Sequence, residues 1–232
     1  MESPKFTAAL IVGAGSGLSA SLARAFAADG MKVALAARNV AKLEPLRSSG
    51  MQVFACDASE EAQVDRLFSE VDAAMGAPDV VVYNASARSR GPFVDLAAAD
   101  IQRALAVTAF GAFCVAQRAV RRMLPKKHGA ILLTGASASV KGYAQSAPFA
   151  MGKFALRGMA QSMARELAPQ GIHVAHFVID GGIRQAGREP YNQAPDGMLE
   201  PDAIASTYMH VLHQPRSAWT WEVELRPWVE KF

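Results

Sequence analysis

Short apolar runs alternate with longer segments of helical periodicity along the whole chain. An apolar run of about four to eight residues between turn residues is typical of a buried strand, whereas apolar positions spaced about three and four apart indicate an amphipathic helix. The runs that predict strands are 8–12, 32–37, 51–55, 80–83, 130–134, 172–179 and 221–225. The segments that predict helices are 18–29, 40–48, 60–75, 100–124, 148–167 and 202–213.

This alternation predicts an α/β fold. Strands that are separated by helices of this length pair in parallel through right-handed crossovers. Neither an internal repeat nor a linker divides the chain. We therefore predict one domain over residues 1–232, built on a doubly wound parallel sheet of about seven strands.

The composition is ordinary for a globular protein. Of the 232 residues, 51% are hydrophobic and 19% are charged, which allows a sizeable core. The formal net charge is +3 and the basic residues are scattered, so we expect no nucleic-acid partner. Because no apolar run reaches the roughly 18 residues that span a bilayer, and no secretory signal is visible, we expect no membrane partner and a cytoplasmic location.

Cysteine and histidine spacing gives no sign of a metal centre. Cys56 and Cys114 lie inside apolar runs, which predicts buried thiols in a reducing compartment. His210 and His213 stand three residues apart on a predicted helix, but no cysteine or further acid completes a ligand set. We therefore expect no bound metal.

A glycine-rich turn follows the first predicted strand and opens the first predicted helix. It reads Gly13-Ala14-Gly15-Ser16-Gly17-Leu18. Glycines permit a tight turn and let the backbone approach a pyrophosphate, which binds the free amides of the helix N-terminus. The turn therefore predicts a dinucleotide-binding Rossmann fold with contacts from Gly13, Gly15, Ser16, Gly17 and Leu18; the alternative is a purely structural turn.

The end of the second predicted strand favours NADP(H) over NAD(H). It reads Ala36-Ala37-Arg38-Asn39, with no acid to bind a ribose 2′-hydroxyl. Arg38 could pair with a 2′-phosphate, with Asn39 and Lys42 beside it. The alternative for Arg38 is a solvated surface charge.

The order of these signals resembles the short-chain dehydrogenase/reductase family across nearly the whole chain. The turn resembles that family's GxxxGxG motif, with Ser19 where the last glycine usually stands. Asp57 with Ala58, the segment Tyr83-Asn84-Ala85-Ser86, and the segment Asp180-Gly181-Gly182-Ile183 resemble the family's Asp, NNAG and PGxI motifs, with Asp180 in place of proline. The resemblance implies a homodimer or homotetramer assembled through the two long helices. It also implies cofactor contacts from Asp57, Ala58, Asn84, Ala85, Lys153, Gly181 and Ile183.

The family's catalytic positions carry unusual residues here. The family has a Tyr and a Lys four residues apart, which places both on one helical face, and a Ser thirteen residues before the Tyr. The corresponding residues of this chain are Phe149, Lys153 and Ala136, and Thr108 stands where the family has Asn. Of the four positions, only the lysine matches.

Loss of the phenol should leave cofactor binding intact and remove general acid catalysis worth about 10²–10⁴-fold, unless another group donates the proton. Lys153 would still reach the ribose. Tyr143, on the loop before the helix, is the first candidate donor, and its alternative role is a pocket wall. Ser137, Ser139 and Ser146 are further candidates, whose hydroxyls could instead bond their own loop.

Three functions remain open at this stage. The first is an NADP(H)-dependent oxidoreductase that acts on a small-molecule carbonyl, alcohol or imine with an unusual proton donor. The second is a catalytically silent NADP(H)-binding pseudoenzyme or scaffold, and the third is a non-redox lyase or cyclase. We expect a substrate lid at about 184–201 and a subunit contact made by the aromatic tail 219–228. His176 and Asp180 could titrate near the substrate, although a strand histidine is more often a core residue.

Overall fold

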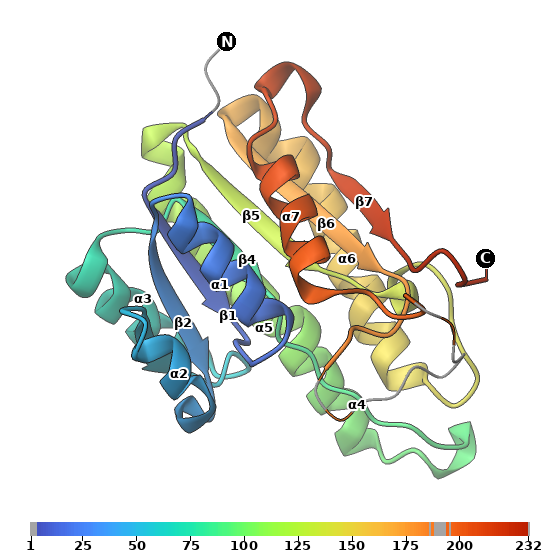
Figure 1. Ribbon diagram of the computed structural model, residues 1–232. Helices are drawn as coiled ribbons and strands as arrows, with labels where there is room; N and C mark the ends of the chain where they lie inside the picture. Colours follow the sequence, from blue (N-terminus) through green and yellow to red (C-terminus); the bar gives the residue numbers. More distant parts are fainter. Residues whose placement is uncertain (1–3, 186, 188–193, 195, 232) are drawn as a thin grey trace.

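The computed structural model describes residues 4–185, 187, 194 and 196–231, and it has seven parallel strands in one sheet. The strands are β1 (Ala8–Val12), β2 (Lys32–Ala37), β3 (Gln52–Ala55), β4 (Val80–Tyr83), β5 (Gly129–Thr134), β6 (Ile172–Ile179) and β7 (Glu222–Leu225). Their order across the sheet is β3-β2-β1-β4-β5-β6-β7. The predicted single-domain, doubly wound α/β fold is therefore confirmed (Figure 1).

The helices follow the sequence prediction closely, with two exceptions. They are α1 (Leu18–Ala28), α2 (Glu44–Arg47), α3 (Glu61–Met75), α4 (Ala98–Leu105), α5 (Gly111–Met123), α6 (Ala147–Leu167) and α7 (Pro201–Leu212). The helix predicted over 40–48 is a 3₁₀ turn, η1 (Val40–Leu43), and then the short α2, because Pro45 begins a new helix. The helix predicted over 100–124 is divided into α4 and α5 by a π-helical turn, η3 (Ala106–Phe110).

Two hydrophobic cores lie on opposite faces of the sheet, and β1 contributes to both. Ala9 and Ile11 pack in a cluster with α1 and α7, whereas Leu10 and Val12 pack in a cluster with α3, α5 and α6. Alternate residues of a strand face opposite sides, and here both sides are covered by helices (Figure 1). A strand that is buried on both faces is apolar throughout, as β1 is.

The helical run Ala98–Lys126 corrects the expectation that no segment could span a bilayer. By length and composition alone it is long and apolar enough to cross a membrane. One side of it is buried in the core, where Cys114, Val115 and Ala119 are inaccessible to solvent. We therefore interpret it as a core helix of the α/β fold.

The topology places a crevice at the carboxyl ends of β1 and β4. These strands pair directly, with Val12 beside Tyr83, but the chain leaves β1 toward β2 and leaves β4 toward β5. The connections therefore diverge at this point, which is where open α/β sheets bind ligands.

Candidate active site

Two adjoining cavities occupy this edge of the sheet, with volumes of about 460 and 600 Å³, and they share Asn84 and Ser86. The smaller cavity is lined by the glycine turn, the end of β2 and the segment after β3. The larger cavity is lined by the ends of β5 and β6, the start of α6 and the loop after β4. Together they form one cleft along the carboxyl edge.

Close packing requires glycine at the first position of the turn. Gly13 has φ +84°, and a Cβ there would overlap the backbone of Ala85. Ser19, where the family has glycine, donates to the carbonyl of Gly13 at 3.3 Å and accepts from Asn84 Nδ2 at 2.7 Å. Ser19 therefore joins the turn to the segment after β4, a role that sequence reasoning missed.

The N-terminus of α1 suits a phosphate group. In the described part of the chain, no side chain caps this helix and its first turn holds no acid. Its free amides and the positive end of its dipole therefore meet no competing carboxylate in that first turn. A Cβ at Gly15 would meet nothing within 4 Å, so open space, not packing, surrounds this glycine.

The far end of the smaller cavity is cationic. Arg38 and Lys42 line it together with Asn39, whose Oδ1 accepts from Ala41 N at 3.1 Å. Asp57 Oδ1 accepts from the backbone and hydroxyl of Ser59 at 3.0 and 2.7 Å. Burial alone would raise the pKa of Asp57, but these bonds and Arg38 lower it below its ordinary value. This end of the groove therefore carries the two cations Arg38 and Lys42 beside the carboxylate of Asp57.

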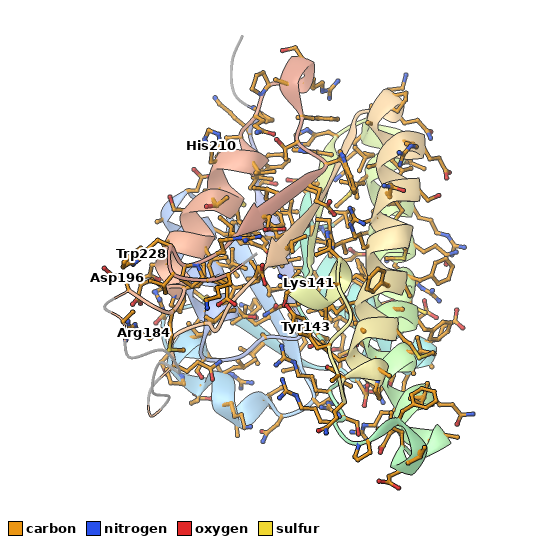
Figure 2. All side chains as sticks on the ribbon, turned by 90° about the vertical axis from the view of Figure 1, so that its right-hand side faces the viewer. Lys141, Tyr143, Arg184, Asp196, His210 and Trp228 are labelled. Atoms are coloured by element: carbon orange, nitrogen blue, oxygen red, sulfur yellow. The ribbon has the colours of Figure 1, made fainter. Side chains whose placement is uncertain are left out.

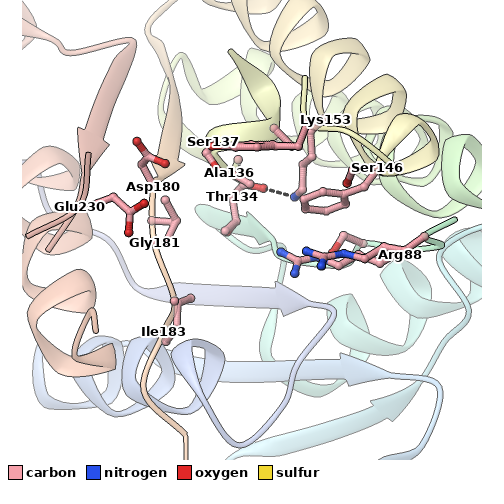
Figure 3. Close-up of a pocket in the computed structure, with 18 of the residues that line it drawn as sticks. Arg88, Thr134, Ala136, Ser137, Ser146, Lys153, Asp180, Gly181, Ile183 and Glu230 are labelled. Carbon is pink, nitrogen blue, oxygen red and sulfur yellow. Dashed lines mark hydrogen bonds between the residues drawn. The ribbon is translucent and has the colours of Figure 1, made fainter. Parts of the chain in front are cut away.

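Lys153 lies at the inner end of the larger cavity. Its Nζ donates to the carbonyl of Thr134 at 2.6 Å, the dashed contact in Figure 3, and only 3% of the residue is exposed. Burial, with a smaller contribution from Arg88, lowers the pKa of Lys153 to about 7. The ammonium is therefore poised to lose and regain a proton near neutral pH.

Apolar side chains occupy the positions next to Lys153. Phe149 and Ala136 pack with Ala138 in a small buried cluster, and the centre of the Phe149 ring is 5.9 Å from Lys153 Nζ. The two residues that replace the family's Tyr and Ser are thus brought together at the cavity. Neither has a proton to give.

Thr108 stands on the π-helical turn η3, fully buried, and it lines neither cavity. Its Oγ1 accepts from Ala87 N at 3.2 Å. A Cβ at Gly152 would lie 2.9 Å from Thr108 Cβ. Glycine at position 152 therefore allows α6 to pack closely against Thr108. Thr108 therefore holds the loop after β4 against α6.

The structure brings three of the predicted hydroxyl donors to the cavity. Tyr143 and Ser137 both line it, as does the buried Ser146. Tyr143 is 45% exposed, and Lys141 Nζ from the same loop lies 5.9 Å from the ring centre (Figure 2). Ser139 instead accepts from Ala136 N at 3.1 Å, so its hydroxyl bonds its own loop.

Asp180, which replaces the family's proline, is buried between two cations. Its Oδ2 lies 3.2 Å from both Lys141 Nζ and Arg226 Nη2. Pro227, which follows Arg226 in the C-terminal segment, packs against Gly181, where a Cβ would lie 2.6 Å from Pro227 Cδ. The C-terminal segment thereby reaches the larger cavity, which Glu230 lines with Gly181 and Ile183.

His176 is a buried core residue that serves as a partner of Glu222. Its Nδ1 lies 3.0 Å from Glu222 Oε2, and Arg157 donates to the same carboxylate at 2.6 and 2.7 Å. Burial lowers the pKa of His176 to about 4, so the ring is neutral at pH 7. A Cβ at Gly135 would overlap this ring, which places the histidine behind the cavity wall.

Arg88 was not predicted as a site residue. Its guanidinium carbon lies 4.1 Å from the centre of the Phe149 ring, and the side chain lines the larger cavity (Figure 3). Gln185, at the start of the predicted lid, was also missed; it lines the cavity and approaches Gly17. Both contacts join residues that are far apart in the sequence, so no local spacing pattern predicts them. Residues 186, 188–193 and 195 of the predicted lid lie outside the described residues.

The remaining sequence expectations concern the tail and a metal. Trp219 stacks on His173 with ring centres 4.6 Å apart, whereas Trp228 is exposed. In the described residues, no group of three or more His, Cys, Asp and Glu side chains is arranged to hold a metal ion.

Comparison with known proteins agrees with this geometry. The sequence model of the short chain dehydrogenase family matches residues 7–193. A short-chain dehydrogenase/reductase of Armillaria gallica is 32% identical over 207 residues, which are 84% of this chain and 78% of that protein.

Two solved structures share the fold over almost their full length. A short-chain dehydrogenase from Rhodopseudomonas palustris has a TM-score of 0.82 and 33% identity, covering 97% of this chain and 100% of that one. An alcohol dehydrogenase from the archaeon Thermococcus sibiricus, complexed with 5-hydroxy-NADP, has a TM-score of 0.84 and 25% identity, covering 97% and 98%. With its sheet order, its glycine turn and the family match over most of its length, this chain belongs to the short-chain dehydrogenase family.

Proposed function

We propose that this protein is an NADP(H)-dependent oxidoreductase that acts on a carbonyl, alcohol or imine without the family's Tyr–Ser pair. The observation that carries the proposal is the single cleft that runs from Arg38 and Lys42 at one end to Lys153 at the other. A dinucleotide bound along this cleft would place its adenosine ribose beside Arg38 and Lys42 and its nicotinamide beside Lys153.

The choice of NADP(H) rests on the charge at the end of β2. Arg38 can form a bidentate, charge-assisted pair with a 2′-phosphate, and Lys42 adds a second positive charge. The related archaeal alcohol dehydrogenase is complexed with 5-hydroxy-NADP, which supports the same preference here. The nicotinamide, when bound, supplies or accepts the hydride.

Lys153 is the proton carrier in this proposal. A general acid works best when its pKa is close to the working pH, and the pKa of Lys153 is lowered to about 7. The Thr134 carbonyl orients the ammonium, and the burial of Lys153 keeps bulk water from it. Tyr143 and Ser137 line the same cavity, and their hydroxyls are the groups that would hydrogen bond a substrate oxygen.

The test begins with NADPH and NADH binding by titration calorimetry. NADPH oxidation is then followed at 340 nm with panels of aldehydes, ketones and cyclic imines. Turnover in any panel supports the proposal. Silence in all three panels, with NADPH demonstrably bound, contradicts its catalytic part.

A second candidate function is NADP(H) binding without turnover. The compact apolar cluster of Ala136, Ala138 and Phe149 favours it, because no hydroxyl stands where the family donates its proton. Tight NADPH binding without reduction of any substrate would support this second function, whereas robust turnover would exclude it.

A further inference from the structure

A buried hydroxyl in the first turn of α1 joins the glycine turn to the segment after β4. Ser19 is 1% exposed, and its Oγ lies 3.3 Å from the carbonyl oxygen of Gly13 and 2.7 Å from Asn84 Nδ2. A hydroxyl has one proton to donate, and a carbonyl oxygen can only accept. The proton of Ser19 therefore goes to Gly13, and Asn84 presents its donor, the amide nitrogen, to the hydroxyl oxygen.

This pairing sets the direction in which the side-chain amide of Asn84 faces. The main chain of Asn84 is held by β1, because its backbone N donates to the carbonyl of Val12 at 2.8 Å. Turning the amide by half a rotation would exchange two hydrogen bonds for one, since the single proton of Ser19 cannot serve both Gly13 and the Asn84 carbonyl. Nδ2 therefore faces Ser19, and Oδ1 faces away from it.

Asn84 stands where the two cavities meet, because it lines both of them. Arg38 and Lys42 line the smaller cavity, and Lys153 lines the larger one. The part of a bound dinucleotide that reaches Asn84 is therefore its middle, the pyrophosphate and the nicotinamide ribose. Pyrophosphate oxygens accept hydrogen bonds, whereas the ribose carries hydroxyl donors. An amide oxygen at this position consequently suits the ribose.

We propose that Ser19 is a positioning residue for the cofactor: it holds the Asn84 amide so that Oδ1 accepts a hydrogen bond from a hydroxyl of the nicotinamide ribose. This inference rests on the proposed NADP(H) binding and adds the residue that orients one of its contacts. Glycine, which the family usually has at this position, has no side chain that could do so. Because the bond is prepared before the nucleotide arrives, less entropy is lost when it binds.

Ser21 offers a matched control for this assignment. It stands two residues further along α1, is 4% exposed, and its Oγ accepts from Arg24 Nη2 at 2.9 Å. It is outside the linings of both cavities described above. Alanine at either position removes one buried hydroxyl from the same helix, but only Ser19→Ala releases the amide of Asn84.

The experiment is titration calorimetry with NADP⁺ and with adenosine 2′,5′-bisphosphate, which has the adenosine end of the cofactor but no nicotinamide ribose. We expect the NADP⁺ affinity to fall at least about 5-fold in Ser19→Ala and in Ser19→Gly, which carries the family's residue. The affinity for the bisphosphate should change less than about 2-fold in both variants, as should both affinities in Ser21→Ala. In an Asn84→Ala background, Ser19→Ala should lower the NADP⁺ affinity by less than about 2-fold. Urea unfolding checks that each variant is folded.

Equal NADP⁺ affinity in the wild type and Ser19→Ala overturns the inference. An equal loss of affinity for NADP⁺ and the bisphosphate also overturns it, because Ser19 would then support the glycine turn as a whole. The same holds if the full loss persists in the Asn84→Ala background, since Ser19 would not act through Asn84. A wild type that binds no NADP⁺ contradicts the proposed function and the inference together, and this outcome is recognised before any variant is compared.

Discussion

Asp180 Oδ2, at the end of β6, lies 3.2 Å from Arg226 Nη2, and this ion pair fastens the C-terminal segment to the wall of the larger cavity. The carboxylate lies at the same distance from Lys141 Nζ, on the loop that carries Tyr143. The aspartate that replaces the family's proline therefore joins two loops through its carboxylate. Asp180 is a positioning residue, since it acts through both segments.

Asp180→Asn should loosen both segments, because Lys141 and Arg226 each lose the ion pair with Asp180. Breaking a buried pair by removing one partner costs about 3–5 kcal/mol, and we expect about 1–2 kcal/mol here because Lys141 and Arg226 are 35% and 18% exposed. Urea unfolding gives this value. Glu224→Gln removes an exposed partner of the same arginine and should cost less than about 0.5 kcal/mol. Equal losses in the two variants would refute the positioning role.

Arg38→Asp should reverse the cofactor preference. The carboxylate would repel a 2′-phosphate and accept bonds from a 2′-hydroxyl, so NADPH affinity should fall about 10- to 100-fold while NADH affinity holds or rises. Titration calorimetry with each nucleotide measures the change. Arg47→Gln, on α2 and outside the lining of the groove, is the control and should leave both affinities unchanged. Unaltered NADPH affinity in Arg38→Asp would show that Arg38 is a surface charge.

The fold could be predicted from the sequence because its strands are buried on both faces. Residues 80–83 are a continuous apolar run, residues 172–179 are apolar except for His173 and His176, and both strands were predicted at the correct positions. The division of the long helix at Thr108 was missed, because a π-helical turn requires only one extra residue and leaves the apolar periodicity nearly unchanged.

The residues of the candidate site were likewise predicted only in part. The glycine turn and Lys153 were found because local spacing carries their geometry. The stacking of Arg88 on Phe149 and the pairing of Asp180 with Arg226 depend on loops whose conformations the sequence does not reveal. Such contacts are set by tertiary packing, and only the departure from the family's proline at Asp180 hinted at one of them.

Lys153 should make the protein more stable as the pH rises from 7 to 9. Its pKa is lowered from 10.5 to about 7 in the folded state, so within this window the unfolded chain binds more protons than the folded one. The free energy of unfolding should therefore rise by about 2 kcal/mol relative to Lys153→Met. Urea unfolding of both proteins at the two pH values measures it. Lys32→Met, at an exposed position of β2, should follow the wild type, and an identical pH dependence in Lys153→Met would contradict the lowered pKa.

We also propose that the protein forms a homo-oligomer through α5 and α6. Phe110, Phe113, Met151 and Phe154 are each about half exposed on this helical surface, and exposed apolar patches of this kind mark subunit contacts. Light scattering should give a multiple of the 24.7 kDa protomer mass. The double variant Phe113→Glu/Phe154→Glu should reduce it to the protomer, whereas Val94→Glu, exposed elsewhere on η2 (Phe93–Asp95), should not. A monomeric wild type would dismiss the proposal.

Phe149→Tyr tests whether the cavity is complete apart from its phenol. The new hydroxyl would stand four residues before Lys153 on the same face of α6, where the lysine could assist its ionisation. If the remaining residues already orient substrate and cofactor, carbonyl reduction should rise by about 10²–10⁴-fold. Phe154→Tyr adds a phenol to the exposed side of the same helix and should leave the rate unchanged. NADPH oxidation with a ketone substrate measures both variants. No gain in Phe149→Tyr, with NADPH binding intact, would contradict the expectation that the cavity is complete apart from its phenol.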